Sequence, residues 1–472
     1  MKTLLVAVLL ALFCTAPAAN GEGGKPLVIR AARLNPIGAG VIESGVLLVQ
    51  DGRIVAMGPS VAIPEGAETL TFEGAVVTPG LIDALCVLGS DRPRSAAERP
   101  EFARRPASLW QSLASKSEHA HSDDEHVCSA ACAGPRNAAE EEEMFAAAAG
   151  VGASWGEQAA EVTPHLRVLD SVDLESQDLT RLLRNGVTTI YVSPDSGQVI
   201  GAQGAIVRTG GALERRVVRA ADAVKASLGA DPIQRGGGNS TPRGGFAGIN
   251  TRRPTTRMGV DFVFRKAFYD AKRAGDGLPL YGADQPPLAA IPALQALLRG
   301  EMPLRIQARL QHDIFSALRL AQEFGVQFVL EDAVEAYQCI PQLKTAGVSV
   351  VYGPLSMIPQ GFRAAIGEAN DARLATPTWL EAAGIPFALT AQELRDEEGL
   401  VRQAMIAARY GLSPAAALRA ITAAPAQILK LPGFGTLEVG GPADLVVWSG
   451  DPLHPASRVQ LVLIEGVVAF RE

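Results

Sequence analysis

The stretch that decides the fold reads PLRIQARL (303–310), HDIFSALRLAQEFG (312–325) and VQFVLED (326–332). The first and third pieces are short apolar runs that predict buried strands, and the middle piece has the apolar periodicity of a helix. Gly325 ends the helix just before the second strand, where a C-terminal glycine cap is common. The stretch therefore predicts a strand–helix–strand unit with parallel strands.

The same alternation extends in both directions from this unit. Upstream, DLTRLLRNG (178–186) predicts a helix and VTTIYVSP (187–194) a strand, and residues 259–275 predict a further helix. Downstream, residues 336–431 continue with helices and strands in turn and finish on helices. Such a long repeat is typical of a (β/α)₈ barrel or a doubly wound sheet. No glycine-rich dinucleotide motif follows an early strand, which favours the TIM-like barrel.

The two ends of the chain have a different character and predict β structure. Residues 26–79 and 433–472 contain apolar runs that turn at Asp51-Gly52 and at Glu465-Gly466, which are hairpin signals. Neither piece has enough strands to bury two faces alone, so we expect a small composite β-sandwich domain built from both. The barrel is then predicted over residues 80–432. Two segments interrupt it, at about 91–160 and 229–257, and are expected to be long loops on one face.

Residues 1–18, MKTLLVAVLLALFCTAPA, predict a secretory signal peptide. An apolar run follows one lysine, and Ala16 and Ala18 have the small-x-small spacing of a cleavage site. A lipoprotein signal at Cys14 is the alternative. We expect an exported protein, with the periplasm and the extracellular medium both left open.

Composition excludes several classes of protein. The chain has 472 residues, 47% hydrophobic and 20% charged, which is typical of a folded globular protein. The net charge of −7 gives no electrostatic reason to expect a nucleic-acid partner. After the first 20 residues no apolar run approaches the length of a membrane span. The chain has only 6 histidines, a small supply for a metalloenzyme.

Two segments resemble a known family. GAVVTPGLIDALCVLG (74–89) resembles the strand that enters the barrel of the amidohydrolase superfamily, close to its imidazolonepropionase-like group. GTLEVGGPADLVVWSGDPL (435–453) resembles the strand with which that family returns to its small β domain. The resemblance covers nearly all of the chain outside the insertions. It implies hydrolysis of carbon–nitrogen bonds by water bound to a divalent metal, usually zinc.

The chain departs from this family where the metal ligands are expected. The family's first barrel strand ends in Asp-x-His-x-His, but here Leu85 and Val87 follow Asp83 and offer no donor atom. Cys86, between them, is expected to point to the opposite side of the strand. Gln307 and Arg309 stand where the family-like pattern is His-x-His.

Three further positions extend this comparison. Asp332 stands where a histidine is expected and is the one replacement that could still bind a metal, whereas Ala391 stands where the family places an aspartate. Arg208 lies in a strand where many relatives have lysine. Outside the segment 119–126 the remaining histidines are not at the C-terminal ends of predicted barrel strands, where barrel chemistry is built; they are His165, His312 and His454.

We therefore expect no metal and no other cofactor at the barrel mouth. Arg208, Gln307, Arg309 and Asp332 are the predicted ligand-binding residues, and an Arg309–Asp332 ion pair is expected to fill the space of the metals. No Gly-x-Ser-x-Gly motif or Cys–His pair offers replacement nucleophilic chemistry.

The two insertions carry motifs with open interpretations. HAHSDDEHVCSAAC (119–132) concentrates histidines, cysteines and acids that could bind zinc or copper, or it is a solvated loop closed by a Cys128–Cys132 disulfide. The arginine-rich stretch 235–257 is either a solvated loop or a loop that holds phosphates or an acidic partner.

Three functional hypotheses follow from the sequence. The first is an exported, catalytically degenerate pseudoenzyme that binds a small-molecule ligand or an active paralogue, with a homo-oligomer left open. The second is a hydrolase acting on carbon–nitrogen (non-peptide) bonds of amides or cyclic amides with a reduced zinc site. The third is a scaffold that needs the fold and no pocket.

Overall fold

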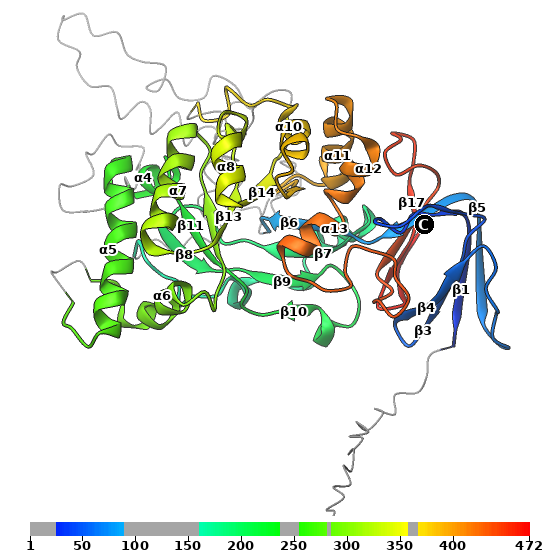
Figure 1. The fold of residues 1–472 in the computed structure, drawn as a ribbon. Coiled ribbons are helices and arrows are strands. Elements are labelled where there is room, and N and C mark those ends of the chain that lie inside the picture. Colours follow the sequence, from blue (N-terminus) through cyan, green and yellow to red (C-terminus); the bar gives the residue numbers. More distant parts are fainter. Residues whose placement is uncertain (1–24, 89–159, 237–253, 281–284, 357–366) are drawn as a thin grey trace, which may run out of the picture.

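The protein consists of a barrel surrounded by helices and a small β domain beside it, as Figure 1 shows. The structure is a computed structural model that describes residues 25–88, 160–236, 254–280, 285–356 and 367–472. The predicted signal peptide and the segment 119–132 lie outside these residues. Helix α5 (Arg257–Gly275) lies at the end of the molecule farthest from the β domain (Figure 1).

Parallel strands form most of the barrel wall. β6 pairs with β7, and β11 to β15 follow in sequence order, while a parallel bridge between Cys86 and Gln392 joins the end of β15 to β6. The helix–strand order predicted from the sequence is present. These strands are β6 (Leu81–Cys86), β7 (Val187–Val192), β11 (Val224–Ser227), β12 (Leu304–Gln307), β13 (Phe328–Glu331), β14 (Ser349–Tyr352) and β15 (Phe387–Leu389).

One position in the wall differs from a regular (β/α)₈ barrel. Strands β8 (Ile200–Gln203) and β9 (Ala205–Arg208) are two halves of one extended stretch between β7 and β11. β8 runs antiparallel to β11 and β9 runs antiparallel to β7. A short strand, β10 (Val217–Arg219), pairs with β9 from outside. The third wall position is therefore an antiparallel strand with no helix of its own.

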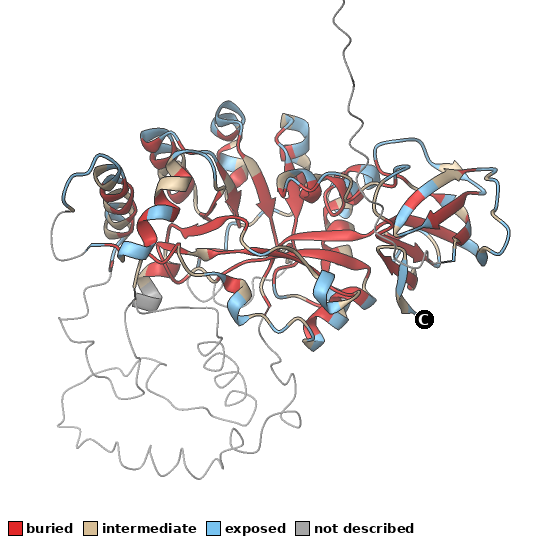
Figure 2. Cartoon of the chain, turned by 90° about the horizontal axis from the view of Figure 1, so that it is seen from below, coloured by how far each residue is buried: buried red, intermediate tan, exposed pale blue. Residues whose placement is uncertain are grey.

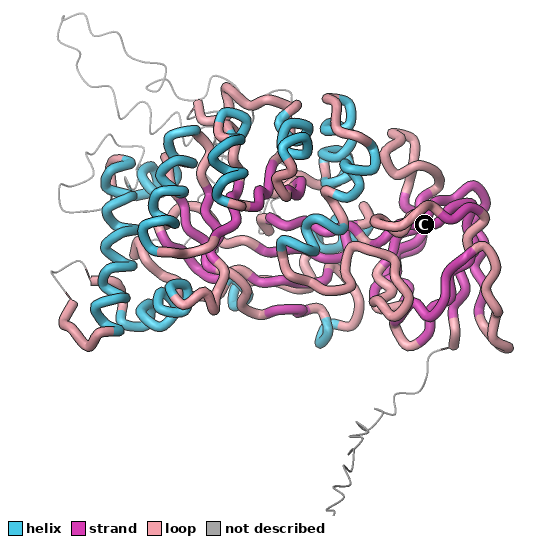
Figure 3. The backbone as a smooth tube through the Cα atoms, in the orientation of Figure 1, coloured by secondary structure: helices cyan, strands magenta, loops and turns pink. Residues whose placement is uncertain are grey.

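Helices cover the outside of the strands, as Figure 3 shows. α7, α8 and α10 end at Gly325, Gly347 and Gly384, each in the left-handed conformation that glycine adopts without strain. No helix within the described ranges is both long and apolar enough to cross a membrane. Besides α5, the α-helices of the described residues are α3 (Gln177–Arg184), α4 (Asp231–Gly236), α6 (Ile291–Leu298), α7 (Gln311–Phe324), α8 (Ile340–Ala346), α10 (Thr376–Ala383), α11 (Leu400–Arg409), α12 (Pro414–Arg419) and α13 (Ala423–Ile428).

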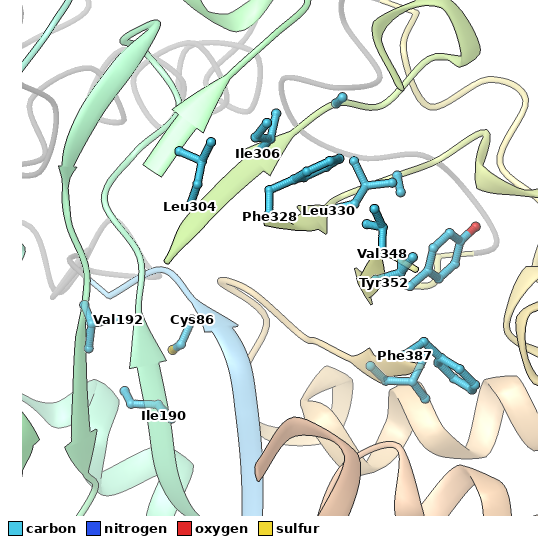
Figure 4. Packing of buried hydrophobic residues seen from close by; sticks show 14 of the residues in the cluster. Cys86, Ile190, Val192, Leu304, Ile306, Phe328, Leu330, Val348, Tyr352 and Phe387 are labelled. Atoms are coloured by element: carbon cyan, nitrogen blue, oxygen red, sulfur yellow. The ribbon is translucent and has the colours of Figure 1, made fainter. Parts of the chain in front are cut away.

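Side chains of the barrel strands alternate between two apolar cores. Leu304 and Ile306 of β12 belong to the large core between strands and helices, part of which Figure 4 shows. Ile82, Tyr191 and Val351 belong to a second core inside the barrel. Figure 2 shows the strands of the barrel wall mostly buried and the helices exposed on their outer faces. Residues at alternate positions of each strand thus face the interior and its mouth.

The small β domain is one curled sheet to which both ends of the described chain contribute. The strand order is β18-β17-β16-β5-β1-β3-β4, with β2 beside β1, and β5 pairs antiparallel with β16. The amide of Ile54 donates to the carbonyl of Gly441, so the sheet curls around its own apolar core. The strands are β1 (Leu27–Leu34), β2 (Ile42–Glu43), β3 (Val46–Gln50), β4 (Arg53–Gly58), β5 (Glu68–Pro79), β16 (Leu445–Trp448), β17 (Val459–Ile464) and β18 (Val467–Arg471).

Candidate functional site

The lower part of the barrel interior holds a buried ion cluster. Lys225 Nζ and Arg305 Nε both donate to the carboxylate of Glu331, and all three side chains are almost fully buried. The Arg305 guanidinium also donates to the carbonyl of Ala84 and lies 4.0 Å from the ring centroid of Tyr191. Burial raises the pKa of Glu331, but the two cations outweigh it and hold this pKa below its usual value.

A second cluster fills the mouth, at the C-terminal ends of the strands, and Arg309 is at its centre. Its Nε lies 2.7 Å from Asp332 Oδ2, and its Nη1 lies 2.8 Å from Glu368 Oε2. Both terminal nitrogens also donate to Asp231. Burial disfavours the charged guanidinium, yet Asp332 and Asp231 outweigh it and raise the pKa of Arg309. Arg309 is therefore a fixed cation held by three carboxylates, and the predicted Arg309–Asp332 ion pair is present.

Two glutamines complete this cluster. Gln307 Nε2 donates to Asp231 Oδ2 at 3.1 Å and to Asp332 Oδ2 at 3.2 Å. Gln392 Nε2 donates to Asp332 Oδ1 at 3.2 Å and to the carbonyl of Gly353 at 3.1 Å. Asp332 and Gln392 have φ angles of 68° and 53°, a region that few residues other than glycine adopt. The cluster therefore holds two residues of strained backbone at the ends of β13 and β15.

The network continues outward to the first turn of α5. Arg257 Nε donates to Asp313 Oδ1 at 2.8 Å, and its Nη2 donates to Glu368 Oε1 at 2.6 Å. Glu368 thus bridges two guanidinium groups; its pKa is raised by burial and lowered by Arg309, and the net shift is upward. Our sequence interpretation of 229–257 as a loop is wrong at both ends, because Asp231 begins α4 and Arg257 begins α5.

Asp83 lies at the seam where β6 meets β15. Its Oδ1 accepts from the amide of Leu85 and its Oδ2 accepts from the amide of Ala391, both at 3.1 Å. Burial raises the pKa of Asp83 to about 6, although hydrogen bonds from Thr390, Leu85 and Ala391 oppose the shift. The carboxylate therefore ties the first barrel strand to the last.

The other predicted positions of this seam divide between the two cores. Leu85 packs in the barrel interior, while Cys86 packs in the helix-facing core, as expected. Ala391 also packs in the helix-facing core, so the side chain that reaches the mouth from this strand end is that of Gln392. The carbonyl of Val87 accepts from the buried Arg395 at 2.8 Å. Val87 and Ala391 thus contribute backbone contacts to the seam.

The structure does not bring Arg208 to the mouth, and its predicted place beside Gln307, Arg309 and Asp332 is wrong. β9 runs antiparallel to β7, so its end lies at the opposite end of the barrel. There Arg208 Nη1 donates to Glu465 Oε1 at 2.9 Å, and Nε and Nη2 contact Asp444 Oδ2 at 3.4 Å. Arg208 therefore joins the barrel to the β domain.

Comparisons with known proteins agree with this architecture. The amidohydrolase family profile matches residues 357–469. The structure of an amidohydrolase from Thermotoga maritima MSB8 superposes with a TM-score of 0.73 at 25% identity, covering 94% of this chain and 100% of that one. The chain is therefore similar to the amidohydrolase superfamily in its fold, and in sequence over residues 357–469. The sequence predicts this α/β barrel beside a small β domain built from both ends of the described chain, and one sheet that curls on itself stands where a sandwich was expected.

Two curated amidohydrolase relatives match over shorter parts. Amidohydrolase tasK of Hapsidospora irregularis is 26% identical over 334 residues, which are 66% of this chain and 33% of tasK. An imidazolonepropionase of Caulobacter sp. (strain K31) is 40% identical over 103 residues, 20% of this chain and 25% of that protein. The chain thus spans a third or less of the length of these relatives.

The residues at the barrel mouth do not fit the divalent metal that the resemblance implies. The side chains gathered there are two amides, three carboxylates and the guanidinium of Arg309, which is permanently charged and repels a second cation. The carboxylates already accept hydrogen bonds from it. Within the described ranges no group of three histidine, cysteine or acidic side chains is arranged to hold a metal ion.

Sequence reasoning missed most members of the two clusters. Lys225 and Arg305 could have been singled out, because each is a charged residue within a short apolar strand. The structure buries both almost completely. Asp231 and Glu368 carry none, since they follow different strands and meet Arg309 only in the folded barrel. His165, His312 and His454 lie outside the barrel strands.

Proposed function

We propose that this chain is a non-hydrolytic, exported member of the amidohydrolase superfamily that acts by binding a small-molecule ligand or an active paralogue, without a metal cofactor. The observation that carries the proposal is the guanidinium of Arg309, held by Asp231, Asp332 and Glu368 at the barrel mouth. This is the end of a barrel where catalytic groups are assembled.

The chemistry of the guanidinium supports this proposal. A divalent metal activates water because it coordinates the oxygen and lowers the pKa of the water. Arg309 supplies positive charge but no vacant orbital, and its donors already point to carboxylates. Asp332 accepts from Arg309, Gln307 and Gln392, so its oxygens are occupied and poorly placed to take a proton from water. Among the residues that the structure describes, the mouth then has neither a nucleophile nor a free base.

Metal content tests the proposal directly. The purified full chain is incubated with excess Zn²⁺ or Mn²⁺, desalted and analysed by mass spectrometry, alongside a variant in which His119, His121 and His126 are alanine. We expect far less than one metal ion per chain in the variant. One ion per chain in both proteins, together with turnover of amide or cyclic amide substrates, would establish the alternative hydrolase. Metal present only in the unaltered chain belongs to residues 119–132 and leaves the proposal standing.

Ligand binding and a scaffold role are separated by thermal unfolding. A molecule that binds only the folded chain stabilises it by RT ln(1 + L/Kd), where L is the ligand concentration, so its Tm rises with the logarithm of the ligand concentration once the site is saturated. We expect a shift from at least one small molecule, or from an active paralogue added in excess, and the shift should be unchanged by chelators. No shift from any of them would favour the scaffold. N-terminal sequencing of the mature protein tests export, with cleavage after Ala18 expected.

A further inference from the structure

A cavity beside α11 lies at the same end of the barrel as the mouth, between the segments that follow β14 and β15 and the β domain. It has a volume of about 450 Å³, within the range of small-molecule pockets. Its walls come from Leu355 in the segment after β14, from the outer face of α11 and from the segment around Leu453 of the β domain. Neither cluster of the barrel interior contributes to it.

One face of α11 supplies both the charge and the apolar surface of this cavity. Arg402, Met405, Ile406 and Arg409 are spaced three, one and three residues apart, which places them on one side of a helix. The opposite side, with Ala404 and Ala407, is buried against the barrel. The helix thus presents an apolar patch flanked by two arginines.

The two arginines are available to a ligand. Both are exposed, and no ion pair joins either one to another residue within the described ranges. Among the described residues of the lining, Glu398 is the one acid, so with the two arginines the charged side chains sum to +1. An ion pair with a single anionic group would neutralise this excess.

The floor of the cavity is fixed by a buried amide. Gln403 Oε1 accepts from the amide of Leu355 at 2.5 Å, and its Nε2 donates to the carbonyl of Glu398 at 3.0 Å. These bonds hold the end of β14 and the start of α11 in place. A ligand would therefore meet walls that need little ordering on binding.

We propose that this cavity binds a small-molecule monocarboxylate with an aliphatic body. The carboxylate pairs with the guanidinium groups of Arg402 and Arg409, and the aliphatic body packs on Met405, Ile406 and Leu453. The apolar lining alone would accept any hydrophobe, but the unpaired arginines select the anion. Binding at this cavity does not require any residue of the Arg309 cluster. The proposal can therefore be tested separately from the proposed lack of hydrolysis.

Octanoate and its neutral analogue octanamide are the probes that test this site. The full chain is labelled with ¹³C at its methionine methyl groups and titrated with each probe. We expect octanoate to shift the Met405 methyl signal with saturation and to leave that of Met258, exposed on α5, unchanged. Octanamide should bind at least tenfold more weakly.

Variants decide whether the arginines select the ligand. The double variant Arg402→Gln/Arg409→Gln should weaken octanoate binding at least tenfold and leave octanamide binding unaltered. The control is Arg184→Gln, which removes an exposed arginine from the last turn of α3 and should change neither. Equal affinity for acid and amide, undiminished binding in the double variant, or a Met405 signal that never moves would each overturn the proposal.

Discussion

At the scale of single residues, the barrel interior is held together by charge rather than by apolar packing alone. Glu331 is bound by two cations, and Arg309 is bound by three anions. Burying such groups is costly, and the cost is recovered only where every partner is in place. The interior therefore tolerates change at these residues poorly, while it specifies which strands must be neighbours.

The free energy of unfolding should depend on pH through the buried carboxyl group of Asp83. Its folded-state pKa of about 6 lies above the ordinary value of 3.8, so between these two pH values the folded protein holds a proton that the unfolded chain has lost. The stabilisation by this proton is complete below the unfolded pKa and is lost as the pH rises through 6. We expect the stability of the chain, relative to that of Asp83→Asn, to fall by about 1–2 kcal/mol between pH 5 and pH 7.5.

Urea unfolding at several pH values measures this difference. Groups other than Asp83 titrate in both proteins, so their contributions cancel in the comparison. Asn can accept from only one of the two amides that Asp83 binds, which lowers the stability of the variant by a constant amount. A stability difference that stays flat, or that grows in favour of Asp83 with rising pH, would show that the carboxyl titrates normally.

At the scale of elements, the antiparallel stretch 200–208 depends on one glycine. A Cβ added to Gly204 would lie 2.1 Å from the hydroxyl oxygen of Tyr191 and 2.3 Å from the adjacent ring carbon. Tyr191 is fully buried inside the barrel, where its ring lies against Arg305, so it has little room to move. The close approach of β8 and β9 to β7 therefore requires glycine here.

Gly204→Ala should accordingly destabilise the protein by about 1–3 kcal/mol through overpacking. The control is Gly40→Ala, whose new Cβ would have no neighbour within 4 Å and whose stability should be unchanged. Thermal and urea unfolding give both values. If steric contact is the cause, Gly204→Ala should cost less in a Tyr191→Leu background than alone. Strictly additive costs would argue against the contact.

The same elements show which parts of the fold and of the mouth cluster could be predicted from the sequence and which could not. The unit 303–332 carries its own signals of periodicity and capping, and it folds as β12, α7 and β13. The direction of 200–208 carries no such signal, because pairing partners are chosen across the whole barrel. Likewise Arg309 and Asp332 follow adjacent strands, so their meeting could be predicted. Glu368 reaches Arg309 from 59 residues away, which no local pattern encodes.

At the scale of the whole molecule, Arg208 couples the barrel to the β domain. It leaves the end of β9 and binds Asp444 and Glu465, which flank the strands β16 and β17 of the curled sheet. Its guanidinium also lies 5.3 Å from the ring centroid of Phe434. Burial raises the pKa of Asp444, and Arg208 opposes this, so the carboxylate depends on its cation.

Arg208→Met should therefore destabilise the chain by about 3–5 kcal/mol, because it leaves the buried Asp444 without a cation. The matched control is Arg215→Met, which removes an exposed arginine 3.3 Å from Glu465 and should cost less than about 1 kcal/mol. Calorimetry should show the transition of Arg208→Met broaden or divide as the two parts lose their coupling. Adding Asp444→Asn should recover part of the loss, since the unpaired charge is its main cause. Equal small costs for both arginines would mean that the domains are joined by apolar packing instead.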